Sequence, residues 1–199
     1  MKTIKKLLDK IKRRIVARQI ESGRRPRGRT NLSPMAARGI GPEKPEGVLK
    51  MTAALSARVM RAGRDSWDEL GVISTKKVTT AFVNYLVDSF QNSAGSPLDV
   101  FKYHDSGIGA VGESNGDTAL GNPCGEARDT GSQAEGASAN IYKTIATHTY
   151  AGTFAITEHG VFSASSSGTL LDRSVFSAIN VITGDKIEFT YQLTCAAET

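Results

Sequence analysis

The sequence is short of several residue types, and each shortage narrows the class of protein. Its 199 residues include only two cysteines, Cys124 and Cys195, which are far apart and lack the spacing of a zinc site. This favours a reducing compartment, and a disulfide between the two cysteines is possible but not implied. No apolar run approaches the roughly 20 residues of a membrane-spanning helix. No uncharged hydrophobic stretch follows the first lysines, so a cleaved secretory signal is not expected either.

Acidic residues are scarce in the first third of the chain, which makes the charge strongly asymmetric. Residues 1–65 contain 18 Lys/Arg and 5 Asp/Glu, a net charge of +13, whereas residues 66–199 contain 7 and 15, a net charge of −8. We expect a basic N-terminal arm that docks onto a large partner, because the arm by itself buries too little apolar surface to offset its ordering entropy. An arginine-rich, acid-poor N-terminus also fits a mitochondrial transit peptide, which remains a competing interpretation.

The arm, residues 1–65, is predicted to have three parts. The spacing of its first apolar residues predicts a short amphipathic basic helix. An Arg/Pro/Gly strap follows from about Ser22, and helix-forming residues predict a second helix over residues 48–64. The candidate partner-binding residues are the cationic Lys5, Lys6, Lys10, Arg13, Arg14, Arg24, Arg25, Arg27 and Arg29, and the apolar helix face Ile4, Leu8, Ile11 and Ile15.

The chemistry of the arm suits an acidic partner, either a nucleic acid or a protein surface rich in carboxylates. Guanidinium groups form paired, charge-assisted hydrogen bonds with phosphates and with carboxylates. No aromatic residue precedes Trp67, so the arm has no stacking platform for single-stranded bases. Its apolar stripe could lie on a membrane surface, on a partner protein or on the body of this chain, and packing against protein is the expected outcome.

The body, residues 66–199, is patterned mainly as β-structure. An amphipathic helix is predicted over about residues 79–91, then a strand over 98–104 and a long glycine-rich loop over about 105–140 with no core element. Alternating residues in 175–181 and 187–195 predict a β-hairpin, and 141–148 with 153–157 predict another. We expect a mainly β fold, an antiparallel β-sandwich or barrel (jelly-roll-like), with one or two helices and an extended basic N-terminal arm.

Candidate catalytic groups are present but do not form a recognised motif. They are His104, His148, His159, Glu158, Asp172 and the two cysteines. The Glu158-His159-Gly160 segment interrupts the alternation and predicts a bulge or turn, with His159 as a surface or hydrogen-bonded residue and a general base as the alternative. Asp172 and Arg173 are predicted to pair across the sheet. We therefore expect no catalytic residues and no enzyme activity.

Metal and phosphate sites receive equally little support from the sequence. Its loop carboxylates do not follow the calcium-loop spacing, so no metal and no cofactor is predicted. Gly107-Ile108-Gly109 with Gly112 resembles a phosphate loop only superficially, because no Lys-Ser/Thr pair or helix follows. The carboxylates considered are Asp105, Glu113, Asp117, Glu126 and Asp129.

Several segments together resemble a group of tailed-bacteriophage virion structural proteins. The resemblance covers about residues 71–194, leaves the arm uncovered, and implies a non-enzymatic component of the particle. It rests on residues 71–74, 78–88, 102–109, 116–120, 156–162, 168–176 and 184–185.

Combined with the basic arm, this resemblance implies a capsid decoration or cement protein in the virion, made in the host cytoplasm. Its expected partners are the major capsid protein lattice and copies of itself, as a homo-oligomer on the particle and without a membrane. A tail, fibre or neck protein is the first alternative. A coat or nucleoid protein whose arm binds packaged nucleic acid is the second.

Overall fold

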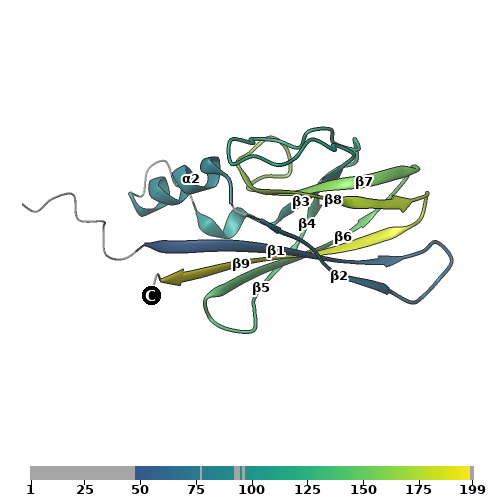
Figure 1. Ribbon diagram of the computed structural model, residues 1–199, viewed down its shortest axis with the longest axis horizontal. Helices are drawn as coiled ribbons and strands as arrows, with labels where there is room; N and C mark the ends of the chain where they lie inside the picture. The colour runs from purple at the N-terminus through teal and green to yellow at the C-terminus, as the bar shows by residue number, and fades with distance from the viewer. Residues whose placement is uncertain (1–47, 77, 92–94, 96, 198–199) are drawn as a thin grey trace, which may run out of the picture. The chain divides into compact units, whose positions relative to one another are not determined.

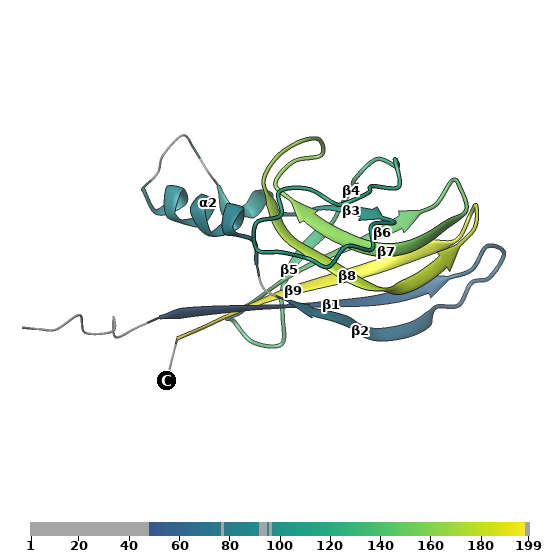
Figure 2. The ribbon, with the colours of Figure 1, turned by 45° about the horizontal axis from the view of Figure 1, so that its top comes forward.

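Two antiparallel sheets stack face to face in the computed structural model, which describes residues 48–76, 78–91, 95 and 97–197. Figures 1 and 2 show the sheets as two layers with helix α2 (Thr80–Phe90) at one end. The five-stranded sheet runs in the order β2 (Asp68–Lys76), β1 (Leu49–Met60), β9 (Lys186–Ala197), β6 (Ile141–Thr149) and β5 (Ser132–Glu135). The four-stranded sheet runs β4 (Asp129–Thr130), β3 (Tyr103–Gly107), β7 (Phe154–Phe162) and β8 (Leu170–Val181). The mainly β, two-sheet fold expected from the sequence is confirmed.

The core lies between the sheets and is built from alternating residues of each strand. In β9, Ile187, Phe189 and Tyr191 are buried, and they pack in one cluster with Ile156 and Val161 of β7 in the other sheet. Each fully buried side chain of this size contributes roughly 1.5–3 kcal/mol by leaving water. The period-two pattern of β9 therefore correctly predicted both the strand and its buried face.

The predicted second helix of the arm, over residues 48–64, is wrong. These residues form strand β1, which lies between β2 and β9 and is hydrogen-bonded to both. Leu55, Ala57 and Val59 are buried with a period of two, which the good helix-forming alanines obscured. Strand formation depends on packing against neighbours more than on intrinsic preference, so two partner strands override the helical propensity of alanine.

Both predicted hairpins are also wrong, although their strands exist. Strand β6 pairs with β9 and β7 pairs with β8, so the links from β6 to β7 and from β8 to β9 cross between the sheets. The two links are hydrogen-bonded to each other, with Tyr150 N donating to Asp185 O at 3.0 Å and Gly184 N donating to Tyr150 O at 2.8 Å. Alternation identifies a strand and its faces but carries no information about its partner.

The helix predicted over residues 79–91 is confirmed as α2 (Thr80–Phe90). Thr79 is its N-cap, and the Thr79 hydroxyl accepts from Phe82 N at 3.1 Å while donating to Leu170 O at 2.6 Å. Phe82 packs edge-on against buried Phe101. The strand predicted over 98–104 is correct only at its end, because Leu98–Val100 forms a 3-10 helix and β3 begins at Tyr103.

The segment predicted as a loop without core residues, 105–140, is more structured than expected. It contains the end of β3 and the short strands β4 and β5, and Leu120 is buried against Phe162 and Leu170. Leu120 is a single apolar residue among glycines, so it produced no periodic pattern in the sequence. Its burial nevertheless fixes the loop to the sheet. None of the helices in the described part of the chain is long and apolar enough to span a membrane.

Candidate functional site

A buried ionic cluster joins the loop that follows β3 to the four-stranded sheet. Glu158, in β7, is completely buried and lies at a register shift between Ile156 and Glu158, which confirms the predicted bulge. Its carboxylate accepts hydrogen bonds from Gly109 N at 3.0 Å, Asn122 N at 2.7 Å and Gly121 N at 2.8 Å. Burial acts to raise the pKa of this carboxyl, but the amides and Arg173 outweigh it, so the pKa lies below its ordinary value.

Arg173, on β8, completes what we call the Glu158–Arg173 cluster. Its guanidinium donates to the Glu158 carboxylate at 2.7 Å, to the Asp117 carboxylate at 2.9 Å and to Val111 O at 3.1 Å. The predicted pairing of Arg173 with a neighbouring strand is confirmed, while buried Asp172 accepts from the Ser174 hydroxyl at 2.8 Å. Because the cluster satisfies its charges internally and contacts the loop at several points, its role is to position the loop.

The close approach of the loop to Glu158 requires glycine at position 107. A Cβ on Gly107 would lie 2.5 Å from Asn122 O and 2.6 Å from Glu158 Oε1. Gly107→Ala is therefore expected to lower the free energy of unfolding by about 1–3 kcal/mol, as overpacking typically does, measured by urea denaturation. In the same loop, a Cβ on Gly112 would meet nothing within 4 Å, so Gly112→Ala serves as the matched control. Equal stability of the two variants would contradict this packing argument.

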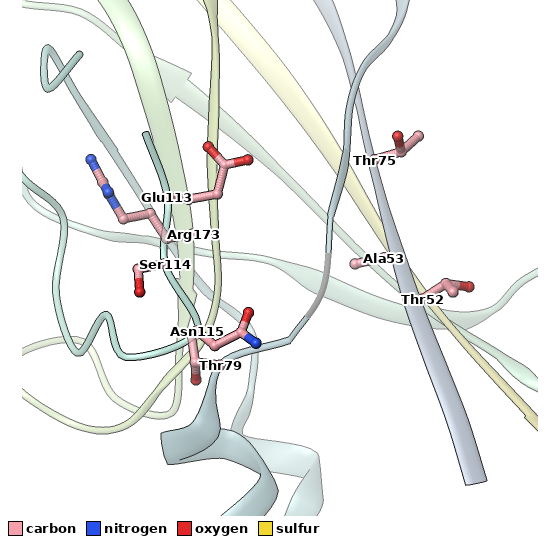
Figure 3. A pocket seen from close by; sticks show the side chains of 8 residues that line it. All are labelled: Thr52, Ala53, Thr75, Thr79, Glu113, Ser114, Asn115 and Arg173. Carbon is pink, nitrogen blue, oxygen red and sulfur yellow. The ribbon is translucent and has the colours of Figure 1, made fainter. Parts of the chain in front are cut away.

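A cavity of about 460 Å³ lies beside this cluster, between the loop and the five-stranded sheet. Figure 3 shows the loop residues on one side of the cavity and the residues of β1 and β2 on the other. The cavity offers hydroxyl, amide and carboxylate groups, while the guanidinium of Arg173 in its wall is engaged by Glu158 and Asp117. The lining residues are Thr52, Ala53, Thr75, Thr79, Glu113, Ser114, Asn115 and Arg173.

Two of the three histidines form a buried row in the core. A hydrogen bond of 3.0 Å joins His104 Nδ1 to His159 Nε2, and another of 3.0 Å joins His104 Nε2 to Thr144 Oγ1. Burial lowers the pKa of His104 to about 3 and that of His159 well below its ordinary value, so both rings are neutral near pH 7. His159 was predicted as a surface or hydrogen-bonded residue; it is hydrogen-bonded, but it is completely buried.

The third histidine, His148 of β6, lies in a separate cluster with Cys124 and Asp129. His148 Nδ1 hydrogen-bonds the Asp129 carboxylate, the ring packs on Tyr150 with centroids 4.6 Å apart, and the nearby Cys124 thiol acts on the charge of the ring. Cys124 Sγ lies 3.6 Å from Ser106 Oγ, which accepts from the Tyr150 hydroxyl at 3.1 Å. We call these residues the Cys124–His148–Asp129 cluster. From the sequence we expected the candidate residues not to form a group, and that expectation missed this cluster. Its loop and strand residues are up to 24 positions apart and meet only in the folded sheet.

The remaining sequence-predicted sites are either dispersed or outside the described residues. Among the residues that the structure describes, no group of three or more His, Cys, Asp or Glu could hold a metal ion. Asp105 pairs with Arg128 at 3.0 Å, and Glu126 accepts from Ala151 N at 2.9 Å, so these carboxylates bind separate partners. Every candidate residue of the basic arm, from Ile4 to Arg29, lies outside the described part of the chain.

One end of the sandwich carries exposed apolar side chains. Helix α2 presents Val83, Val87 and Phe90 to solvent, with 38, 47 and 77% of their surface exposed, and Leu98 follows at 45%. We call these four residues the α2 apolar surface. Figures 1 and 2 show α2 at the same end of the sandwich as the beginning of β1.

These features define the protein, at the level of fold, as a two-sheet antiparallel β-sandwich with a buried ionic cluster and exposed apolar residues at one end. A scan against protein-family models finds no match, and a search of curated proteins finds none either.

Proposed function

We propose that this protein is a non-enzymatic structural component of a tailed-phage particle, and specifically a capsid decoration or cement protein. In this proposal it is held on the major capsid subunits by its basic arm and stabilises the shell. The resemblance of residues 71–194 to phage virion structural proteins supports the class of protein. The β-sandwich fold is compatible with that class, although fold alone does not assign function.

The observation that carries the structural part of this proposal is the α2 apolar surface. Phe90 is 77% exposed, and Val87 and Val83 lie about one and two turns before it on the same outward side of the helix. Exposed apolar side chains that are contiguous in this way mark protein interaction surfaces. We infer that this end of the domain contacts a neighbouring subunit, while the arm contributes charge.

The arm adds an electrostatic component to this attachment. Residues 1–47, which precede the described domain, hold 14 Lys/Arg and 4 Asp/Glu, and this net charge of +10 suits an acidic protein surface. Repetition on a symmetric lattice multiplies weak individual contacts into avidity. The same positive charge would also attract packaged nucleic acid. Binding to capsid shells and binding to nucleic acid must therefore be measured side by side.

The first test measures copy number in purified particles of the phage that encodes the chain, by quantitative mass spectrometry. A decoration protein is expected at hundreds of copies per particle. A copy number of a dozen or fewer would place the protein in the tail or neck, and its absence from particles would overturn the proposal.

The second test measures binding of the full-length protein to shells stripped of it. Replacing Arg24, Arg25, Arg27 and Arg29 with glutamine should weaken shell binding at least tenfold, because each positive charge contributes to an attraction that salt screens. In the control, four cations of the described domain are replaced with glutamine, so the net charge changes by the same amount as in the arm variant. These are Lys50, Arg64, Lys102 and Lys143. Equal binding by both variants would contradict the arm's role, and tighter, steeply salt-dependent binding to random DNA would favour a genome-facing protein.

A further inference from the structure

The two cysteines have similar partial exposure but opposite electrostatic surroundings. Burial is the main influence on the Cys195 thiol, and it raises the pKa of that thiol. Cys124 is also partly buried, but His148, the backbone at Glu126 and the Ser106 hydroxyl outweigh this, so the pKa of the Cys124 thiol is lowered. Cys124 is therefore a candidate reactive thiol, and Cys195 serves as an internal reference for thiol reactivity in the same protein.

The geometry around His148 is that of an oriented base. Asp129 of β4 binds the Nδ1 atom of the ring, which fixes the ring's orientation. Only 6% of the His148 surface is exposed, and its Nε2 atom is buried without a hydrogen-bond partner of normal geometry among the described residues. Geometry places the Cys124 thiol at the same spot: the His148 ring packs on Tyr150 with centroids 4.6 Å apart, and the Tyr150 hydroxyl donates to the Ser106 Oγ that lies 3.6 Å from Cys124 Sγ. A buried ring nitrogen without a partner is costly, and the charge of the neighbouring thiol acts on this ring.

The charges around this cluster favour an imidazolium beside a thiolate. Burial acts to lower the pKa of His148, but Asp129 and Cys124 outweigh it and raise that pKa to about 9. The other groups that face the cluster do not add competing positive charge. Tyr150 has a pKa above its ordinary value because of burial, Glu126 accepts a backbone hydrogen bond, and the nearby histidine row is neutral.

We propose that Cys124, His148 and Asp129 form a nucleophilic thiol site that reacts with small disulfides. His148 holds the proton released by the thiol, and Asp129 holds the ring. The Cys124 sulfur attacks one sulfur of the disulfide, a new S–S bond forms, and the original S–S bond breaks. The second half of the disulfide leaves as a thiolate and takes up a proton, so the disulfide itself is the oxidant. This site is independent of the particle assignment, because it rests on the contacts and charges within the described domain.

The test compares both cysteines in the full-length protein. Iodoacetamide is applied from pH 5 to pH 10, and peptide mass spectrometry follows the alkylation of each cysteine; a sulfur–carbon bond forms as iodide leaves. Cys124 is expected to react at least tenfold faster than Cys195 at pH 6.5 and to reach half-maximal rate at lower pH, because the thiolate is the reactive form. Oxidised glutathione should then form a mixed disulfide at Cys124 ahead of Cys195.

The variants separate an electrostatic role from simple accessibility. His148→Gln should shift the pH midpoint of Cys124 upward and slow its alkylation at pH 6.5 at least tenfold, while the rate at Cys195 stays unchanged. Asp129→Asn should shift the midpoint in the same direction by a smaller amount, and it provides the second variant in case His148→Gln does not fold. In the otherwise unaltered Cys195→Ala protein, thiolate absorbance near 240 nm gives the Cys124 midpoint directly. A midpoint at or above the ordinary value of about 8.5, or one that neither variant moves, would overturn the proposal.

Discussion

Glu158→Gln is expected to lower the free energy of unfolding by about 3 kcal/mol, the low end of the cost of breaking a buried ion pair, because the Asp117 carboxylate still faces Arg173 at 2.9 Å. Arg173 is only 4% exposed, and the substitution removes the carboxylate that lies 2.7 Å from its guanidinium. The amide of glutamine also has a single acceptor oxygen, so it cannot accept from Gly109, Gly121 and Asn122 as the carboxylate does. Urea denaturation of the full-length protein measures the loss.

Glu69→Gln is the matched control for this substitution. Glu69 pairs with Arg58 at 3.6 Å on the surface, with 69% of its side chain exposed. Exposed pairs of this kind contribute less than about 1 kcal/mol, because water and salt screen them. Equal losses in the two variants would mean that the Glu158–Arg173 cluster does not hold the loop as its geometry indicates.

Acidification from pH 7.5 to pH 5 is expected to destabilise the protein, with buried His104 alone accounting for about 2 kcal/mol of the loss. Burial lowers the pKa of His104 to about 3 from the ordinary 6.5, so its contribution to stability is complete above pH 6.5 and is lost as the pH falls toward 3. By linkage this loss is about 2 kcal/mol for His104 at pH 5. His159, whose pKa is also lowered by burial, acts in the same direction.

His148 acts in the opposite direction and partly offsets this loss. Its pKa is raised to about 9, so its contribution to stability is complete below pH 6.5 and is lost as the pH rises through 9. The pH dependence should therefore become steeper in His148→Gln, by about 1 kcal/mol over the same window. Urea denaturation at both pH values gives the difference.

Nuclear magnetic resonance titration of the three imidazole rings checks the assignment directly. His104 and His159 should remain neutral down to pH 5, and His148 should remain protonated up to about pH 8, since its pKa is about 9. A His104 ring that titrates near pH 6.5 would show that the histidine row is open to water and would remove the basis for the expected acid sensitivity.

The sequence predicted elements best where a local pattern and the tertiary environment agree. The helix over residues 79–91 has apolar residues at helical spacing and an N-cap threonine, and both features operate within the element itself. Strand β9 has a strict alternation that its position between β1 and β6 preserves. Residues 48–64 failed because alanine and methionine suit a helix locally, whereas the hydrogen bonds that decide their conformation come from β2 and from the distant β9.

Local sequence patterns predicted almost nothing about how the candidate sites are assembled. The sequence marked Glu158 as a candidate catalytic group and as an interruption of alternation, but nothing in it indicated that three amides from residues 109–122 would surround its carboxylate. Cys124 and His148 were considered separately as candidates, but their proximity depends on the pairing of β3, β4 and β7 and on the position of β6 in the facing sheet.

By itself, the sequence determined the charge asymmetry, the mainly β class, the helix near residue 80 and the faces of the strands. These properties depend on composition or on periodicity over a few residues, which any short segment carries with it. Only the tertiary structure decided which strands pair, that the two links at Tyr150 and Asp185 cross between sheets, and which buried polar groups neutralise one another. Those outcomes depend on contacts between residues far apart in the chain, whose free energy exists only once the two sheets have packed.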